Sequence, residues 1–199
     1  MAEALAHPTW SMGPVVTINS ATLMNKGLEI IEAHHLFGLP YSQIEAVIHP
    51  QSVVHSMVEY KDGSTIAQAS PPNMKGPIAL AINFPHRTVG VTPPIDWSTS
   101  HTWNFSPIDH LRFPAVNLAM HAGKVGGALP AIFNAANEVA VEAFLKEEIA
   151  FIEIIPTVES IMSEYEKTSV PRISQLADVS AIEQDARMRT SELLKKVSR

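Results

Sequence analysis

Proline is unevenly distributed along this chain, and its distribution constrains the possible folds more than any other feature. Eight of the 15 prolines lie between residues 71 and 114. Proline fixes φ and removes a backbone donor, so this stretch cannot form a long helix or a central strand. We expect an extended, ordered stretch with one short helix near 78–83. The chain is therefore divided into residues 1–90, a connector over 91–113, and residues 114–199.

The parts on either side of the connector differ in predicted secondary structure. Before it, we expect one helix, a short strand and a hairpin, over residues 20–37, 44–49, and 52–60 with 64–70. The dipeptide Asp62-Gly63 is the hairpin signal. After it, we expect four helices, over residues 115–122, 129–146, 151–166 and 180–197. Short connections favour an antiparallel bundle. The predicted fold class is α+β: a partial α/β domain with a β-hairpin-containing sheet, followed by a C-terminal α-helical bundle.

Composition argues against several classes of function. The 199 residues carry a net charge of −6 without a basic cluster, so nucleic acid is not an expected partner. The absence of cysteine excludes disulfides, thiolate catalysis and cysteine-zinc sites, and it favours a cytoplasmic location. We recognise neither a signal peptide nor an apolar run of about 18 residues, so no membrane association is expected.

The densest group of functional side chains lies in residues 19–29. Four polar residues there share one side of the expected helix: Thr22, Asn25, Lys26 and Glu29. Asn19 or Ser20 is the expected N-cap. Donor groups at a helix start suit a phosphate, and a carboxylate one turn deeper suits Mg²⁺ or Mn²⁺. The alternative is a solvated helix face with an ordinary Lys26–Glu29 pair.

Five longer motifs carry a resemblance to a known family. They are HPTWSMG (7–13), NSATLMNKGLE (19–29), IHPQSVVHSMVEYKDGS (48–64), QASPPNM (68–74) and FNAANEVAVEAFL (133–145). With them the chain closely resembles the 1-deoxy-D-xylulose 5-phosphate reductoisomerases of the non-mevalonate isoprenoid pathway. The family's N-terminal NADPH-binding domain has no counterpart here, and no G-x-G-x-x-G follows a predicted strand. The chain looks like the C-terminal half of such an enzyme.

The resemblance implies a reaction. The family converts 1-deoxy-D-xylulose 5-phosphate to 2-C-methyl-D-erythritol 4-phosphate with NADPH and a divalent metal (Mg, Mn or Co). Residues 1–90 would be the C-terminal part of its catalytic domain, and residues 114–199 its helical domain. The family's other two metal carboxylates lie upstream, so this chain alone is expected to be inactive. The alternatives are a non-catalytic dimerisation or scaffold module and a metal-independent sugar-phosphate-binding protein.

The resemblance also implies roles for single residues. Glu29 would be the one metal ligand present, and His7 would share the catalytic role with it. The implied substrate-binding residues are His7, Trp10, Ser20, Asn25, Lys26 and Glu29. The implied cofactor-binding residues are Met12, Gly13 and Met74. The family commonly has Asp where Asn73 stands, so the role of this position is open.

Other polar residues are expected to be structural. His49 and His55 lack the spacing of a zinc pair and fit the sheet or a dimer contact better. In the predicted bundle, Asn134, Asn137 and Glu138 would hold the helices against the catalytic domain.

The hairpin is more apolar than a solvated sheet edge should be, because it contains Val53, Val54, Met57 and Val58. We therefore expect a homodimer formed through the sheet.

Overall fold

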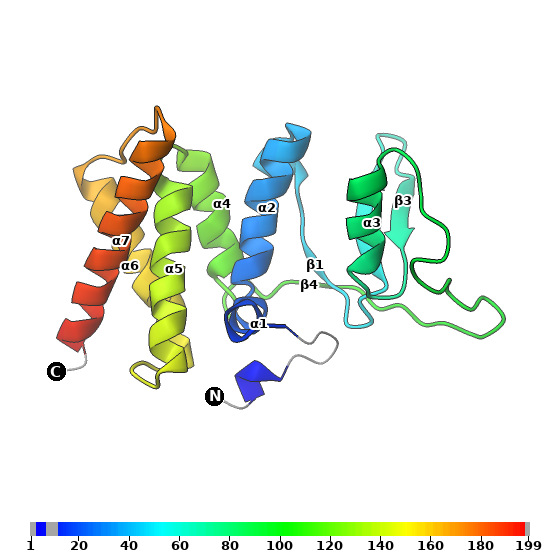
Figure 1. Cartoon of the computed structure of the whole chain (residues 1–199), viewed down its shortest axis with the longest axis horizontal. Coiled ribbons are helices and arrows are strands. Elements are labelled where there is room, and N and C mark those ends of the chain that lie inside the picture. Colours follow the sequence, from blue (N-terminus) through cyan, green and yellow to red (C-terminus); the bar gives the residue numbers. More distant parts are fainter. Residues whose placement is uncertain (1–2, 7–11, 198–199) are drawn as a thin grey trace. The chain divides into compact units, whose positions relative to one another are not determined.

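The computed structural model describes residues 3–6 and 12–197 (Figure 1). The chain forms two compact units. Unit 1 is Met1–Ala46 with Asp109–Arg199, and unit 2 is Val47–Ile108. This division differs from the expected one, because the helices before residue 46 belong with the bundle. Domain boundaries at residues 90 and 114 stay a prediction.

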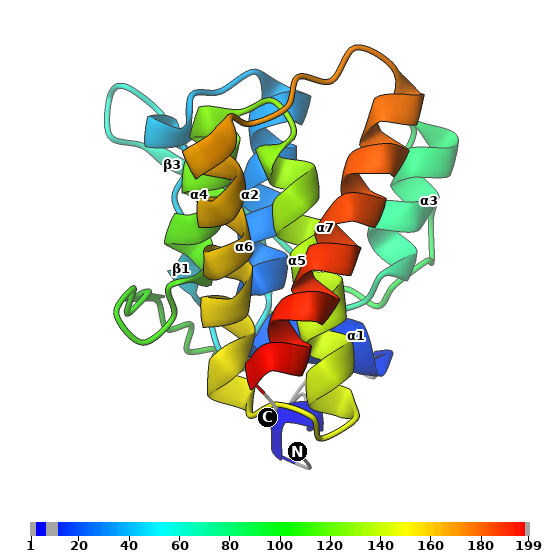
Figure 2. The ribbon, with the colours of Figure 1, turned by 90° about the vertical axis from the view of Figure 1, so that its left-hand side faces the viewer.

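Unit 1 is helical. Its elements are η1 (Glu3–Leu5), α1 (Pro14–Ala21), α2 (Met24–Phe37), η2 (Tyr41–Gln43), α4 (Ala115–Val125), α5 (Leu129–Leu145), η3 (Phe151–Glu153), α6 (Ile154–Thr168) and α7 (Leu176–Val197). Helix α5 contacts α1, α4, α6 and α7, and α5, α6 and α7 run side by side (Figure 2). The last four helices agree closely with the sequence prediction. None of the described helices is long and apolar enough to cross a bilayer.

The core of unit 1 is built on α5. Ile132, Phe133 and Val141 of this helix are fully buried, as its apolar spacing predicts. Helices α2 and α4 come unusually close: a Cβ added to Gly27 would lie 2.6 Å from the Cβ of Ala119. The missing side chain at position 27 therefore lets α2 dock on α4.

The expected helix over residues 20–37 is two helices in the structure. Leu23 has a left-handed backbone (φ 59°) and separates α1 from α2. Asn19 and Ser20 lie in the last turn of α1, so the prediction that either is an N-cap is wrong. The apolar–polar pattern missed this break because left-handed backbone usually occurs at glycine. The predicted end of the helix at Gly38 is confirmed.

Unit 2, as described, contains one helix and two separate two-stranded antiparallel sheets. Strand β1 (Val47–Ile48) pairs with β4 (Ser106–Pro107), and β2 (Val54–Glu59) pairs with β3 (Thr65–Ala69). Helix α3 (Lys75–Asn83) follows the hairpin. The hairpin turn is as predicted, with Gly63 at φ 83° and Asp62 Oδ1 accepting from the Ser64 N–H at 2.9 Å. The predicted α+β fold class is confirmed.

Candidate functional site

The first turns of α2 bring together three of the predicted site residues. Asn25 Nδ2 donates to Glu29 Oε1 at 2.6 Å, and Lys26 Nζ forms an ion pair with Glu29 Oε2. The side chains of Lys26 and Glu29 are 43% and 44% exposed. The set is therefore open to a ligand while its members contact one another. The helical spacings of three and four residues produce this convergence.

Within the described ranges, the same turn also has backbone N–H groups without a hydrogen-bond partner. The Met24 N–H binds Thr22 Oγ1 at 3.3 Å, and the Gly27 N–H binds the Leu23 carbonyl at 3.0 Å. Helix geometry leaves the N–H groups of Asn25 and Lys26 without a carbonyl in their own helix. The helix dipole adds positive potential at this end. The beginning of α2 thus offers backbone donors and an ammonium group to an anion.

Two residues expected near these groups take different positions. Ser20 is half-buried in the last turn of α1, and its carbonyl accepts from the Leu23 N–H at 3.1 Å. Thr22 is 4% exposed, and its hydroxyl donates to the Ile18 carbonyl at 3.0 Å. The expectation that Thr22 shares the polar stripe is therefore wrong. The turn at Leu23 takes Thr22 out of α2 and buries it in the corner.

The remaining predicted ligand contacts are only partly described. His7 and Trp10 lie outside the described residues. Met12 is half-buried and Gly13 is exposed, directly before α1. A Cβ added to Gly13 would meet none of the described residues within 4 Å. Met74 belongs to unit 2 and is 57% exposed next to α3.

The described residues do not form a metal centre by themselves. They contain no group of three or more His, Cys, Asp or Glu side chains able to hold a metal ion. Glu29 can supply one carboxylate, and both of its oxygens already have donors from α2. Mg²⁺ requires further oxygen ligands at near-octahedral geometry. We therefore derive no reaction step at a metal ion from these ligands alone.

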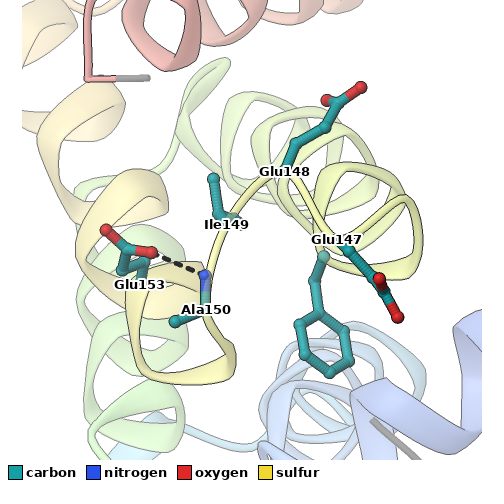
Figure 3. Close-up of a pocket in the computed structure, with 6 residues that line it drawn as sticks. Glu147, Glu148, Ile149, Ala150 and Glu153 are labelled. Atoms are coloured by element: carbon teal, nitrogen blue, oxygen red, sulfur yellow. Dashed lines mark hydrogen bonds between the residues drawn. The ribbon is translucent and has the colours of Figure 1, made fainter. Parts of the chain in front are cut away.

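A pocket of about 450 Å³ lies at the turn between α5 and α6 (Figure 3). It is lined by Phe144, Glu147, Glu148, Ile149, Ala150 and Glu153, and by none of the predicted site residues. Glu153 Oε2 accepts from the Ala150 N–H at 2.6 Å and closes the turn. The carboxylates of Glu147, Glu148 and Glu153 point in different directions (Figure 3). The pocket therefore offers no converging ligand set.

Asn73 has a local structural role in unit 2. Its Oδ1 accepts from the Lys75 N–H at 2.9 Å at the start of α3. An Asp at this position can accept the same bond, so the departure from the family pattern preserves this contact.

Both histidines of the hairpin region make structural contacts. The His49 ring stacks on Phe105 with centroids 4.4 Å apart, and its Nδ1 hydrogen-bonds the Asn104 carbonyl at 2.9 Å. His55 Nε2 hydrogen-bonds the Ser70 carbonyl across the hairpin at 3.0 Å. These contacts support the expected structural roles.

Sequence reasoning missed one partnership near the site. Asn137 Nδ2 of α5 donates to Asn19 Oδ1 of α1 at 3.0 Å. The sequence predicts a helix cap at Asn19, and it predicts that Asn137 holds the bundle against the catalytic domain. No periodic pattern relates two positions 118 residues apart, so only the folded chain could reveal the pair.

Comparisons with protein families cover most of the chain. A model described as DXP reductoisomerase C-terminal domain matches residues 69–189, and a model described as 1-deoxy-D-xylulose 5-phosphate reductoisomerase C-terminal domain matches residues 1–37. The 1-deoxy-D-xylulose 5-phosphate reductoisomerase of Rhodococcus jostii is 56% identical over 97% of this chain and 48% of its own length. The enzyme of the same name from Kitasatospora griseola is 55% identical over 96% of this chain and 50% of its own length.

Solved structures are similar as well. A DOX-P reductoisomerase in complex with NADPH, fosmidomycin and magnesium superimposes with a TM-score of 0.90 at 39% identity, covering all of this chain and 50% of that one. The Zymomonas mobilis reductoisomerase in complex with NADPH gives 0.85 at 45% identity, covering 90% of this chain and 47% of that one. The chain spans about half the length of the curated relatives it matches. On these matches, the chain belongs to the 1-deoxy-D-xylulose 5-phosphate reductoisomerase family.

Proposed function

We propose that this chain supplies the phosphate-binding end of the substrate site, and one metal ligand, in an NADPH-dependent reductoisomerase. The enzyme would convert 1-deoxy-D-xylulose 5-phosphate to 2-C-methyl-D-erythritol 4-phosphate. The observation that carries the proposal is the convergence of Asn25, Lys26 and Glu29 at the open N-terminus of α2. The reaction is that of the related reductoisomerases, two of which form complexes with NADPH, and one of these also contains magnesium.

The Lys26–Glu29 ion pair supports a simple exchange when substrate binds. A phosphate monoester carries close to two negative charges at neutral pH. At the same distance, the two charges of the phosphate attract the Lys26 ammonium more strongly than the single charge of the Glu29 carboxylate does. Lys26 therefore gains by turning from Glu29 to the phosphate. The Glu29 carboxylate then becomes available as an oxygen ligand for a divalent cation, whether Mg, Mn or Co.

The expected contacts outside α2, with the cofactor and with the substrate, are also part of the proposal. The open space above the backbone of Gly13 supports a close approach by the nicotinamide ring. Met12 and Met74 would contact the cofactor, and Ser20 the substrate. His7 and Trp10 would close over the substrate. A cytoplasmic location stays a proposal that rests on the absence of cysteine.

A chimera tests the proposal. This chain would replace the matching half of the Rhodococcus jostii enzyme, and NADPH oxidation would be measured with substrate and Mg²⁺. We expect turnover in the chimera and its near-complete loss in Glu29→Gln, which preserves shape but removes the anionic ligand. Thermal unfolding of both proteins would confirm that they are folded. A folded chimera without turnover, or an active Glu29→Gln variant, would contradict the proposal.

We also propose that the chain forms a homodimer through the β2–β3 hairpin. Val58 and Ile66 face each other across the hairpin and are 57% and 62% exposed. Among the described residues, β2 and β3 pair only with each other, so both outer edges are open. The exposed apolar pair and the open strand edges also favour the alternative function, a non-catalytic dimerisation or scaffold module. That module would dimerise but would not restore turnover in the chimera.

A further inference from the structure

A buried pair of amides joins α5 to the corner in front of α2. Asn137 is completely buried and Asn19 is 9% exposed. Asn137 Nδ2 donates to Asn19 Oδ1 at 3.0 Å. The bond attaches the last turn of α1 to the centre of the bundle, where α1 packs on α5.

Stability alone does not explain Asn137. Its Oδ1 is buried and has no hydrogen-bond partner among the described residues. An unpaired buried amide oxygen costs free energy that an apolar side chain would not cost. Three nearby residues of α5, Ala135, Ala136 and Ala140, are completely buried. The amide at position 137 is therefore best explained by its bond to Asn19, the one side-chain hydrogen bond it makes within the described part of the chain.

The corner that Asn137 holds sets the spacing of the proposed phosphate ligands. Asn19 directly precedes Ser20, and its carbonyl accepts from the Thr22 hydroxyl at 3.3 Å. Leu23 then adopts its left-handed conformation, which L-residues tolerate only when their surroundings enforce it. Lys26 follows on α2. The position of Ser20 relative to Lys26 thus depends on how α1 is anchored.

We propose that Asn137 is a positioning residue. Acting through Asn19, it fixes α1 against α5 and so holds Ser20 and the first turn of α2 in the arrangement that receives one phosphate group. The proposal rests on the proposed function, since it takes the start of α2 as the phosphate site. Asn134 lies one turn earlier on α5, and its amide donates to Glu138 Oε1 within the same helix at 3.0 Å. Asn134 is therefore a matched control, because its side-chain hydrogen bond stays within α5.

The test is a titration of this chain with inorganic phosphate. The backbone amide NMR signals of Asn25 and Lys26 report the binding. We expect saturable shifts in the unaltered chain and in Asn134→Ala. In Asn137→Ala the dissociation constant should rise about fivefold to tenfold, because the donors remain but are misplaced. Asn19→Ala, at the more exposed end of the pair, should give the same rise. The double variant should be no weaker than either single one, because both changes remove one interaction.

Different failures have different meanings. Phosphate affinity unchanged in both Asn137→Ala and Asn19→Ala would overturn the positioning role, even if their melting temperatures fall. A role limited to stability would lower the melting temperature of Asn137→Ala and leave phosphate affinity intact. If Lys26→Ala does not weaken phosphate binding, or if the unaltered chain shows no saturable shift, the proposed phosphate site itself is wrong. If Lys26→Ala weakens binding and the two asparagine variants do not, only the positioning role is wrong.

Discussion

At the scale of single residues, the proposed function makes Lys26 the side chain on which substrate capture should depend most. It is the ammonium group at the N-terminus of α2, and it is half exposed. In the chimera, Lys26→Ala should raise the KM for the phosphorylated substrate by roughly 10- to 100-fold, the equivalent of one lost charge-assisted contact. We expect a smaller change in kcat, since the contact exists before and during the reaction. Steady-state kinetics would measure both values.

A second lysine provides the control for Lys26→Ala. Lys146 forms an exposed helical ion pair with Glu142 at 2.7 Å, and none of the proposed roles involves it. Lys146→Ala should leave KM unchanged. Equal effects of the two substitutions, or no effect of either, would count against the assignment of Lys26.

The site residues show what local sequence can and cannot predict. Asn25, Lys26 and Glu29 converge as expected, because spacings of three and four residues on one helix determine which side chains meet. Thr22 departs from that pattern because a single left-handed residue, Leu23, turns the chain. The partner of Asn19 could not be predicted, because tertiary packing alone brings α5 to α1.

At the scale of elements, the helices of the C-terminal bundle could be predicted from the sequence, whereas several features of the segment before it could not. The C-terminal helices are strongly periodic and punctuated by glycine and proline, so their positions were predictable to within a few residues. The strand expected over 44–49 shortens to Val47–Ile48, because its partner is the equally short β4. Long-range pairing of this kind leaves little trace in a local pattern. The association of α2 with α4 was likewise not visible in the sequence.

The α2–α4 contact gives a prediction about stability. In Gly27→Ala, the new Cβ would lie 2.6 Å from the Cβ of Ala119 and 3.3 Å from the Ala115 carbonyl oxygen. Neither atom is at the end of a flexible side chain, so the helices must separate. Overpacking should cost about 1–3 kcal/mol of stability. The better helix propensity of alanine should recover about 1 kcal/mol. The expected net effect is a loss of up to about 2 kcal/mol. Chemical denaturation would measure the difference.

Two further variants make this prediction specific. Ala119→Gly combined with Gly27→Ala moves the methyl group to the other helix and should recover part of the lost stability. Gly13→Ala adds a methyl group in open space at an ordinary φ of −61°, and should change stability by less than about 1 kcal/mol, mainly because alanine is a poorer N-cap for α1 than glycine. If Gly27→Ala proves as stable as Gly13→Ala, the close approach of α2 and α4 is not a constraint on the fold.

At the scale of the whole molecule, the hairpin predicts the oligomeric state. An exposed Val58–Ile66 pair on a hairpin with open edges favours association with a second copy. We expect a dimer in sedimentation equilibrium at micromolar concentration. Val58→Lys should shift it towards monomer, whereas Val89→Lys, at a position 96% exposed in a loop of the same unit, should not. A monomer at micromolar concentration in the unaltered chain would count against the proposed interface.

The last prediction concerns binding without turnover. The 199 residues contain the backbone donors and the Lys26 ammonium at the start of α2, so the chain alone should bind phosphate weakly. Glu29 is its one assigned metal carboxylate, and a single carboxylate does not hold Mg²⁺ tightly against water. No glycine-rich nucleotide motif places a hydride donor near the substrate, and hydride transfer requires reacting atoms about 3–3.5 Å apart. We therefore expect no NADPH oxidation with substrate and Mg²⁺, and no tight Mg²⁺ binding in calorimetry. Adding the other half of a family enzyme in trans should restore turnover. Turnover by the purified chain alone would mean that its residues form a complete site at a place not assigned above.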